Sequence, residues 1–224
     1  MDNSKILWES MVAEAKQREQ LLLGEYTSEI YRVDPRHLCY VLSRYKFCSS
    51  MLQGMDRVIE VGIGDGFGSP LVASRVKQLI CTDIDQDMLD KTRTRNSFLE
   101  NVRFEYFDFI HASFPEKVDG IFLVDVIEHV FPNEESAFVG NLVDSLNHKG
   151  VIIMGTPNKA ASQYASHASK EGHVNLKDAT ALKDLGYQYF NNVFLFGMND
   201  EVLHTGFPSM CHYLWVICSS PKRS

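Results

Sequence analysis

Two carboxylates accompany a run of closely spaced glycines in the stretch VIEVGIGDGFGSP, which covers residues 58–70. Glu60 precedes the first glycine, and Asp65 lies inside the run. The glycines stand at every second position: Gly62, Gly64, Gly66 and Gly68. Glycines let a ligand approach bare backbone amides, and carboxylates favour a ligand that carries positive charge at that point. The pattern therefore predicts a binding loop for a partly cationic ligand.

A dinucleotide fits this loop poorly, which disfavours a NAD-linked oxidoreductase. The G-x-G-x-x-G fingerprint needs its third glycine where this chain has Phe67, and no Gly-Lys-Ser/Thr triplet follows to make a P-loop. S-adenosylmethionine fits better, because it carries an ammonium and a sulfonium but no phosphate. Asp83 ends the next apolar segment, 21 residues after Gly62, where a carboxylate can accept both ribose hydroxyls.

Short apolar segments alternate with helical ones from Arg57 onward, and this alternation positions the loop. We expect strands at 57–61, 79–83, 102–107, 119–125, 150–155, 192–198 and 211–219, and helices at 68–78, 86–99, 134–146 and 176–186. The alternation predicts an α/β fold: a Rossmann-like, doubly wound sheet of seven strands, mostly parallel, with the last two paired as an antiparallel hairpin at one edge. Ligands of such sheets bind beyond the carboxyl ends of the strands, where the glycine run lies.

The N-terminal part reads as an extension to this sheet. We expect residues 1–53 to form a helical extension or lid and residues 54–224 to form the S-adenosylmethionine-binding domain. One amphipathic helix is expected at about 4–23, and a second from the Asp-Pro pair at 34 to about 53. The intervening loop carries aromatic and charged side chains that are candidates to cover a cofactor: Tyr26, Tyr31 and Arg32.

Four successive segments resemble the motifs of class I S-adenosylmethionine-dependent methyltransferases: VIEVGIGDGFGSPLVA, LICTDID, FEYFDF and VDGIFLVDVIEHV. The resemblance spans Arg57 to about Gly155. It implies that Glu60 and the glycines Gly62 and Gly64 line the methionine moiety. The other implied cofactor contacts are Asp83 for the ribose, Ile84, Asp108 and Phe109 for the adenine, and Asp125 closing over the cofactor. Asp85 competes with Asp83 for the ribose role, and we favour Asp83.

The segment SRYKFCSSMLQG resembles an Arg-Tyr pair that precedes the first motif in many methyltransferases of surface-polysaccharide and small-molecule pathways. This resemblance implies that Arg44 binds the cofactor carboxylate, which a guanidinium fork matches well. A solvated helix arginine beside a core tyrosine is the alternative interpretation.

Histidines follow the fourth, fifth and sixth predicted strands, so the topology should bring them together over the acceptor. His129, His173 and His204 are the candidate catalytic residues, because imidazole titrates near neutral pH and can take a proton from an alcohol. His167 lies in the same region of the chain. Structural roles are the alternative for each of these. We expect the remaining histidines to be structural or solvated: His37, His111, His148 and His212.

A divalent metal is a further possibility for the stretch DVIEHV. Asp125, Glu128 and His129 resemble an acidic-x-x-Glu-His pattern of small-RNA 2′-O-methyltransferases and ubiquinone-pathway O-methyltransferases, with His173 as the implied fourth ligand. A bound ion would acidify a nearby hydroxyl. Many metal-free relatives share the same pattern, so the resemblance leaves both alternatives open.

The bulk composition narrows the partners. The 224 residues carry 22 Lys and Arg against 29 Asp and Glu, a formal charge of −7, and no basic run that would favour nucleic acid. The longest apolar runs are too short for a bilayer. The start of the chain lacks a signal segment, and five scattered cysteines fit reduced thiols, so we expect a cytoplasmic protein.

We therefore expect a methyltransferase that uses S-adenosylmethionine and acts on a small molecule or sugar-like metabolite at oxygen. The alternatives are a metal-assisted RNA 2′-O-methyltransferase and a non-catalytic module that only binds S-adenosylmethionine.

Overall fold

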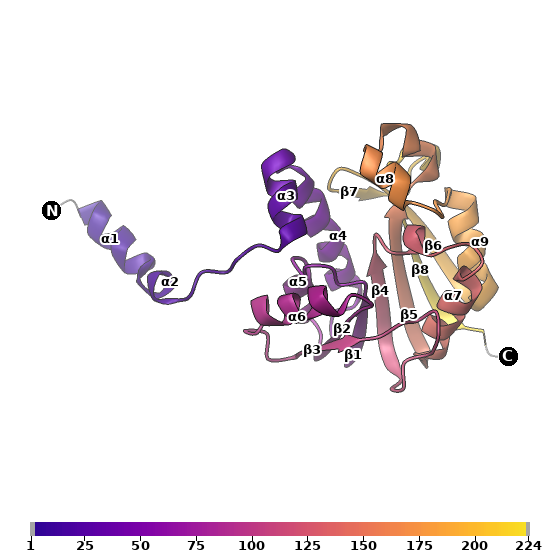
Figure 1. Ribbon diagram of the computed structural model, residues 1–224, viewed down its shortest axis with the longest axis horizontal. Helices are drawn as coiled ribbons and strands as arrows, with labels where there is room; N and C mark the ends of the chain where they lie inside the picture. The colour runs from indigo at the N-terminus through magenta and orange to yellow at the C-terminus, as the bar shows by residue number, and fades with distance from the viewer. Residues whose placement is uncertain (1–2, 223–224) are drawn as a thin grey trace.

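The computed structural model describes residues 3–222 and shows one twisted sheet between two layers of helices (Figure 1). Within that range the sheet has eight strands in the order β3-β2-β1-β4-β5-β8-β6-β7. Their bounds are β1 Arg57–Val61, β2 Gln78–Asp83, β3 Val102–Tyr106, β4 Val118–Val124, β5 Leu146–Pro157, β6 Phe190–Asn199, β7 Val202–His204 and β8 Tyr213–Pro221. The first five strands pair in parallel, which confirms the predicted Rossmann-like α/β fold.

The C-terminal strands depart from the prediction in one respect. β8 does pair with β6 in antiparallel fashion, but it lies between β5 and β6 rather than at the edge. Its residues Leu214, Trp215 and Val216 are fully buried, as suits a strand that is covered on both faces. The strand at this edge is instead β7, which is short and which the sequence pattern did not predict. Within residues 3–222 the sheet therefore has eight strands rather than the seven expected.

Helices cover both faces of the sheet, and the alternation of residues along β1 separates the two cores. Ile59 and Val61 pack in the core beneath α7 (Glu135–Asp144) and α9 (Ala179–Tyr189). Val58 packs on the other face beneath α4 (His37–Met51), α5 (Ser69–Ala73) and α6 (Gln86–Arg95). Four short helices follow β4 in the described part of the chain: η1 Ile127–His129, η2 Lys159–Tyr164, α8 His167–Gly172 and η3 Pro208–Met210. Among residues 3–222, none of the helices has both the length and the apolar character needed to cross a bilayer.

The N-terminal region differs from the expected pair of helices. The first expected helix is broken into α1 (Asn3–Met11) and α2 (Ala13–Gln17), and the chain then runs as an irregular segment to Gly24. Figure 1 shows both helices standing away from the sheet, and neither buries any of its residues. Short helices without a packing partner gain little stability in water, which explains the early end.

The segment expected to be a loop is a helix, α3 (Glu25–Val33), and α4 begins only at His37. Asp34 does not cap α4, because its carboxylate accepts a hydrogen bond from the Arg36 guanidinium at 3.0 Å. α4 buries Tyr45 and Cys48 in the same core as the sheet. The division at residue 54 stays a prediction, and residues 1–2 of the expected extension lie outside the described range.

Candidate functional site

The glycine-rich loop, residues 62–68, joins β1 to α5 at the point where the strand order reverses between β1 and β4. Gly62, Gly64 and Gly66 have φ angles of 70°, 55° and 69°, a region that side chains disfavour. A Cβ atom on Gly62 would lie 2.6 Å from the Val126 side chain. The loop therefore needs glycine at Gly62 both for its backbone angle and for close packing.

Asp83 and Asp85 take different roles at the end of β2. The Asp83 carboxylate faces the loop, where Oδ2 accepts a hydrogen bond from the Gly64 amide at 3.0 Å and Oδ1 accepts one from the Asp85 amide at 2.9 Å. Asp85 caps α6, since its Oδ1 accepts from the Met88 amide at 3.0 Å. Ile84 between them is 63% exposed beside the loop. Neither Asp83 nor Ile84 is among the residues that line the two cavities described below, and the ribose role of Asp83 stays a prediction.

Glu60 supports the loop from beneath rather than lining a cavity, and its expected contact with the cofactor stays a prediction. β1 turns its side chain toward α4 and α5, and the residue is only 1% exposed. The carboxyl accepts hydrogen bonds from the Tyr45 hydroxyl at 2.8 Å and the Cys81 thiol at 3.4 Å. Burial raises the pKa of Glu60 to about 7.

Asp108 and Phe109, which follow β3, also make contacts within the fold. Phe109 is 2% exposed and packs against Phe107 with ring centroids 4.6 Å apart. Asp108 stabilises the following turn: its Oδ1 accepts from the Ile110 amide at 2.8 Å, and its Oδ2 lies 2.8 Å from His111 Nδ1. The adenine contacts of Asp108 and Phe109 stay a prediction.

A first cavity of about 460 Å³ lies along the glycine-rich loop, between α3, α4 and the end of β4. Arg44 and Asp125 both line it and are joined by an ion pair of 2.7 Å between Nη1 and Oδ2. The Arg44 guanidinium also lies 3.9 Å from the centre of the Tyr213 ring. Burial lowers the pKa of Arg44, but the charge of Asp125 together with Tyr213, Glu128 and the hydrogen bond to Asp125 gives a net rise of the pKa.

Two further polar atoms of Arg44 and Asp125 take no part in this ion pair. Arg44 Nε and Asp125 Oδ1 are buried and have no hydrogen-bond partner within residues 3–222. Asp125 also has a φ of 56°, which is uncommon for a residue with a side chain and is typical of functional positions. Unpaired buried polar atoms are costly unless a ligand or water satisfies them. This part of the cavity is therefore suited to a polar ligand group.

A second cavity of about 710 Å³ adjoins the first, between α3, the end of β5 and α8. Six residues line both: Tyr26, Ile30, His37, Pro157, Ser169 and His173. The two spaces therefore meet along a shared wall, as a donor site and an acceptor site must.

Two of the three candidate catalytic histidines come together at this wall. The rings of His129 and His173 have centroids 5.1 Å apart. His129 Nδ1 lies 2.9 Å from the Gly172 carbonyl oxygen, which can only accept, so Nδ1 carries the proton and Nε2 is the basic nitrogen of the neutral ring. Burial and the neighbouring His129 lower the pKa of His173, which favours its neutral, basic form.

His204 does not join them, which corrects the expectation for this residue. It lies on the edge strand β7, opposite Gly197, and lines neither of the two cavities. Its Nδ1 accepts a hydrogen bond from the Gly206 amide at 3.0 Å, and its Nε2 lies 3.9 Å from Cys211 Sγ. The fold uses His204 to hold the turn after β7.

Sequence reasoning missed several cavity residues, because their positions depend on how α3 and the C-terminal strands dock. His37, expected to be structural or solvated, lines both cavities, and burial lowers its pKa. His212 lines the second cavity. Tyr26 was named as a possible cover and does line both cavities, whereas Tyr31 and Arg32 are exposed, and Arg32 pairs with Glu29. No spacing in the chain distinguishes His37 from the other histidines.

Three of the four expected metal ligands also converge. Ligand atoms of Glu128, His129 and His173 lie within 4.8 Å of one another. Glu128 is buried, its Oε2 accepts from the Thr156 hydroxyl at 2.9 Å, and its Oε1 has no partner in the described part of the chain. Burial and the charge of Asp125 raise the pKa of Glu128. Asp125 itself is engaged with Arg44 and is not part of this group.

The central part of the chain is similar to a known protein family. Residues 58–150 match a family model described as a methyltransferase domain. A probable S-adenosylmethionine-dependent methyltransferase of Mycobacterium tuberculosis is 28% identical over 103 residues, which is 46% of this chain and 36% of that protein. A similarly named protein of Mycolicibacterium smegmatis matches at 28% identity over 38% of its own length. The matched region thus spans little more than a third of these curated relatives.

Solved structures share the fold over most of the chain. The DhpI complex with S-adenosylhomocysteine superposes with a TM-score of 0.65 at 14% identity, over 88% of this chain and 92% of that one. The N-methyltransferase NodS from Bradyrhizobium japonicum, also with S-adenosylhomocysteine, gives 0.61 at 17% identity, over 86% and 92%. The methyltransferase domain of bacterial CtHen1 gives 0.65 at 16% identity, over 80% and 99%. At 14–17% identity, these likenesses show that the chain shares the fold of these methyltransferases.

Proposed function

We propose that the protein transfers a methyl group from S-adenosylmethionine to an oxygen of a small-molecule or sugar-like acceptor, a proposal supported by the match of residues 58–150 to the methyltransferase-domain model. The observation that carries this proposal is the pair of adjoining cavities, one along the glycine-rich loop and one beside the imidazoles of His37 and His173. Their shared wall gives a donor and an acceptor a common boundary at which to react.

The chain offers matching groups for each part of the cofactor. The Asp83 carboxylate would accept the ribose hydroxyls, and the exposed Ile84 side chain would pack on the adenine. Arg44 Nε and Asp125 Oδ1, which lack partners within residues 3–222, would bind the carboxylate and ammonium of the methionine part. Once bound, the sulfonium supplies an activated methyl group, so the protein needs mainly to position the acceptor and exclude water.

An alcohol acceptor needs a base, and the shared wall supplies one. His173 is held neutral by burial and by His129, so its ring can take the proton as the new bond to oxygen forms. His129 Nε2 is a second candidate, since the Gly172 carbonyl fixes its proton on Nδ1. The resemblance of the motif region to ubiquinone-pathway O-methyltransferases supports oxygen as the receiving atom.

Calorimetry with S-adenosylhomocysteine tests the cofactor half of the proposal, and radiolabelled methyl transfer to a panel of sugars and hydroxylated metabolites tests the acceptor half. We expect binding and transfer to at least one hydroxyl-bearing acceptor. Transfer only to amines would refute O-methylation. Binding without transfer to any acceptor would instead favour a non-catalytic binding module, and no binding would refute both functions.

Metal-assisted methylation of an RNA 2′-hydroxyl is a second candidate, favoured by the convergence of Glu128, His129 and His173. The two imidazoles and the carboxylate are ligand types that borderline divalent ions accept. Against RNA stands the formal charge of −7. Methyl transfer measured before and after exhaustive chelation separates the two candidates, since the metal-free mechanism predicts full activity without the ion.

A further inference from the structure

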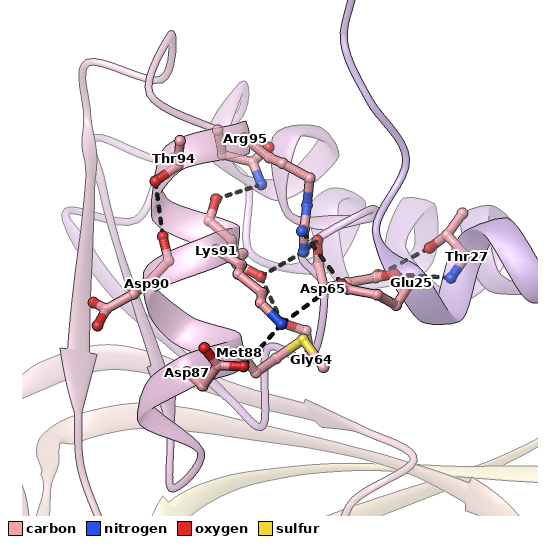
Figure 2. Close-up of polar contacts among 12 residues, drawn as sticks. Glu25, Thr27, Gly64, Asp65, Asp87, Met88, Asp90, Lys91, Thr94 and Arg95 are labelled. Carbon is pink, nitrogen blue, oxygen red and sulfur yellow. Dashed lines mark hydrogen bonds and ion pairs between the residues drawn. The ribbon is translucent and has the colours of Figure 1, made fainter.

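Asp65, the carboxylate inside the glycine-rich loop, bonds to a helix rather than facing the cavity alone. Its Oδ2 accepts a hydrogen bond from the Thr27 amide and its Oδ1 accepts one from the Thr27 hydroxyl, both at 2.8 Å and both buried. The two residues are 38 positions apart in the chain. Figure 2 shows Asp65 between α3 on one side and α6 on the other.

This contact caps α3 from outside the helix. Thr27 is the third residue of α3, so its amide is one of the N-terminal donors that lack a partner within the helix. Gly24, the residue at the N-cap position, has no side chain that could accept from it. A Cβ atom on Gly24 would lie 2.2 Å from Asp65, so glycine is required for the two to approach. The loop therefore supplies the cap that α3 cannot make for itself.

The surrounding charges tie the same three elements together (Figure 2). Glu25 at the start of α3 pairs with Lys91 at 3.1 Å and with Arg95 at 3.6 Å, both on α6. Arg95 also donates to the Asp65 backbone carbonyl at 3.2 Å. Thr92 of α6 donates to the Gly64 carbonyl at 2.9 Å. Loop, α3 and α6 thus form one polar network.

The docking of α3 depends on this network, because little else holds the helix. Thr27 is the one residue of α3 that is buried, and large side chains such as Tyr31 and Val33 are exposed. Segments with few buried apolar contacts open at low free-energy cost. Yet α3 carries Tyr26 and Ile30, which line both cavities. The shape of the acceptor cavity therefore depends on whether α3 is docked.

We propose that Asp65 is a positioning residue that links occupation of the glycine-rich loop to docking of α3, so that binding of the methyl donor completes the acceptor cavity. The inference rests on the proposed function, because it takes the loop to be the donor site. A ligand that orders residues 62–68 fixes the Asp65 carboxylate, and the fixed carboxylate holds the first turn of α3. The acceptor then meets a finished wall that contains Tyr26 and Ile30.

Hydrogen exchange of α3 amides, with and without S-adenosylhomocysteine, tests the link in the full chain. In the wild-type protein we expect the ligand to slow exchange of α3. In Asp65→Ala, which removes both acceptors, exchange without ligand should be about fivefold faster, the effect of losing a helix cap. Thr27→Val removes the hydroxyl donor but keeps the amide bond, so its exchange should rise by less. Thr27→Ser keeps both donors and should behave as wild type.

Calorimetry on the same samples separates the possible failures. If S-adenosylhomocysteine binds the wild type and Thr27→Val but hydrogen exchange of the α3 amides is equal in all variants, Asp65 does not hold α3 in place. If Asp65→Ala binds the ligand and exchange of the α3 amides still slows as much as in the wild type, the link does not pass through Asp65. If the wild type gives no binding heat, the proposed function fails and the link fails with it. Unchanged exchange of β4 amides serves as the control for overall folding.

Discussion

At the scale of single residues, the carboxylates around the glycine-rich loop differ in their hydrogen-bond partners. Glu60 is buried beneath the loop and bonded to Tyr45, Asp65 is bonded to Thr27, and Asp85 caps α6. Asp83 touches only the Gly64 and Asp85 amides through its two oxygens and still faces the loop. A carboxylate oxygen can accept more than one hydrogen bond, so Asp83 retains acceptor capacity for a ribose.

Replacing Asp83 should therefore weaken the cofactor site, whereas a matched change at Asp85 should not. We expect Asp83→Ala to lower affinity for S-adenosylhomocysteine by roughly tenfold to a hundredfold, the loss of one or two hydrogen bonds to a charged group. Asp85→Asn keeps a good N-cap for α6 and should bind normally. Calorimetry on both variants checks this, and an equal loss in the two would reassign the ribose role.

The buried Glu60 should make stability depend on pH. Its pKa is raised to about 7 in the folded protein, whereas an unfolded glutamate titrates near its ordinary value of about 4.3. Between these values the folded state binds the extra proton, so its contribution to stability is full below about pH 4.3 and is lost as pH rises toward 7.

Glu60→Gln should remove this dependence. The free energy of unfolding of the wild type, relative to the variant, should fall by about 1.4 kcal/mol per pH unit between pH 5 and 7. Urea unfolding at several pH values measures the difference, and parallel curves for the two proteins would mean that Glu60 is ionised in the fold.

At the scale of elements, the glycine-rich loop and α3 both depend on contacts from distant parts of the chain. The loop bends through positive φ angles because Val126, from the segment after β4, closes against Gly62. α3 begins where it does because Asp65 caps it. Neither element would keep its geometry without contacts from distant parts of the chain.

Gly62→Ala should therefore damage the protein, while an alanine at a helical glycine should not. At Gly62 the new Cβ meets Val126 at 2.6 Å with φ at 70°, so we expect a loss of roughly 1–3 kcal/mol in unfolding free energy and weaker cofactor binding. Gly140 of α7 has open space around an added Cβ, so Gly140→Ala should be neutral or more stable by up to about 1 kcal/mol. Thermal or urea unfolding compares the two, and a neutral Gly62→Ala would show that the loop relaxes.

At the scale of the whole molecule, the N-terminal region divides into a part that joins the core and a part that does not. α4 buries its side chains against the sheet, whereas α1 and α2 bury none of theirs. Exposed apolar side chains gather on these two helices and the segment after them: Ile6, Leu7, Trp8, Met11, Leu21 and Leu22. The sheet with α3 to α9 thus contains both cavities and both hydrophobic cores.

Deleting residues 1–17 should leave the stability of the monomeric fold almost unchanged, within about 0.5 kcal/mol, because within the described part of this segment α1 and α2 bury none of their residues. Leu52→Ala, at a fully buried position just after α4, should cost about 2–5 kcal/mol. Chemical denaturation of both variants tests the contrast. A large loss on deletion would mean that the N-terminal helices pack on the body or on another copy.

The sequence by itself determined the sheet and the position of the site. Short apolar strands and intervening helices can be read locally, and the glycines after the first strand lie where the strand order reverses. The roles of Gly62, Gly64 and Asp83 at that point stay predictions. What only the tertiary structure decided were the partners of each side chain. Glu60 follows its face of β1 beneath α4, where Tyr45 donates to it, and Phe109, in the loop after β3, packs into the core. His204 belongs to an edge strand, and His37 lines the cavities from the start of α4. Hydrophobic periodicity records which face a residue takes, but a hydrogen bond between residues 38 positions apart leaves no local pattern in the chain.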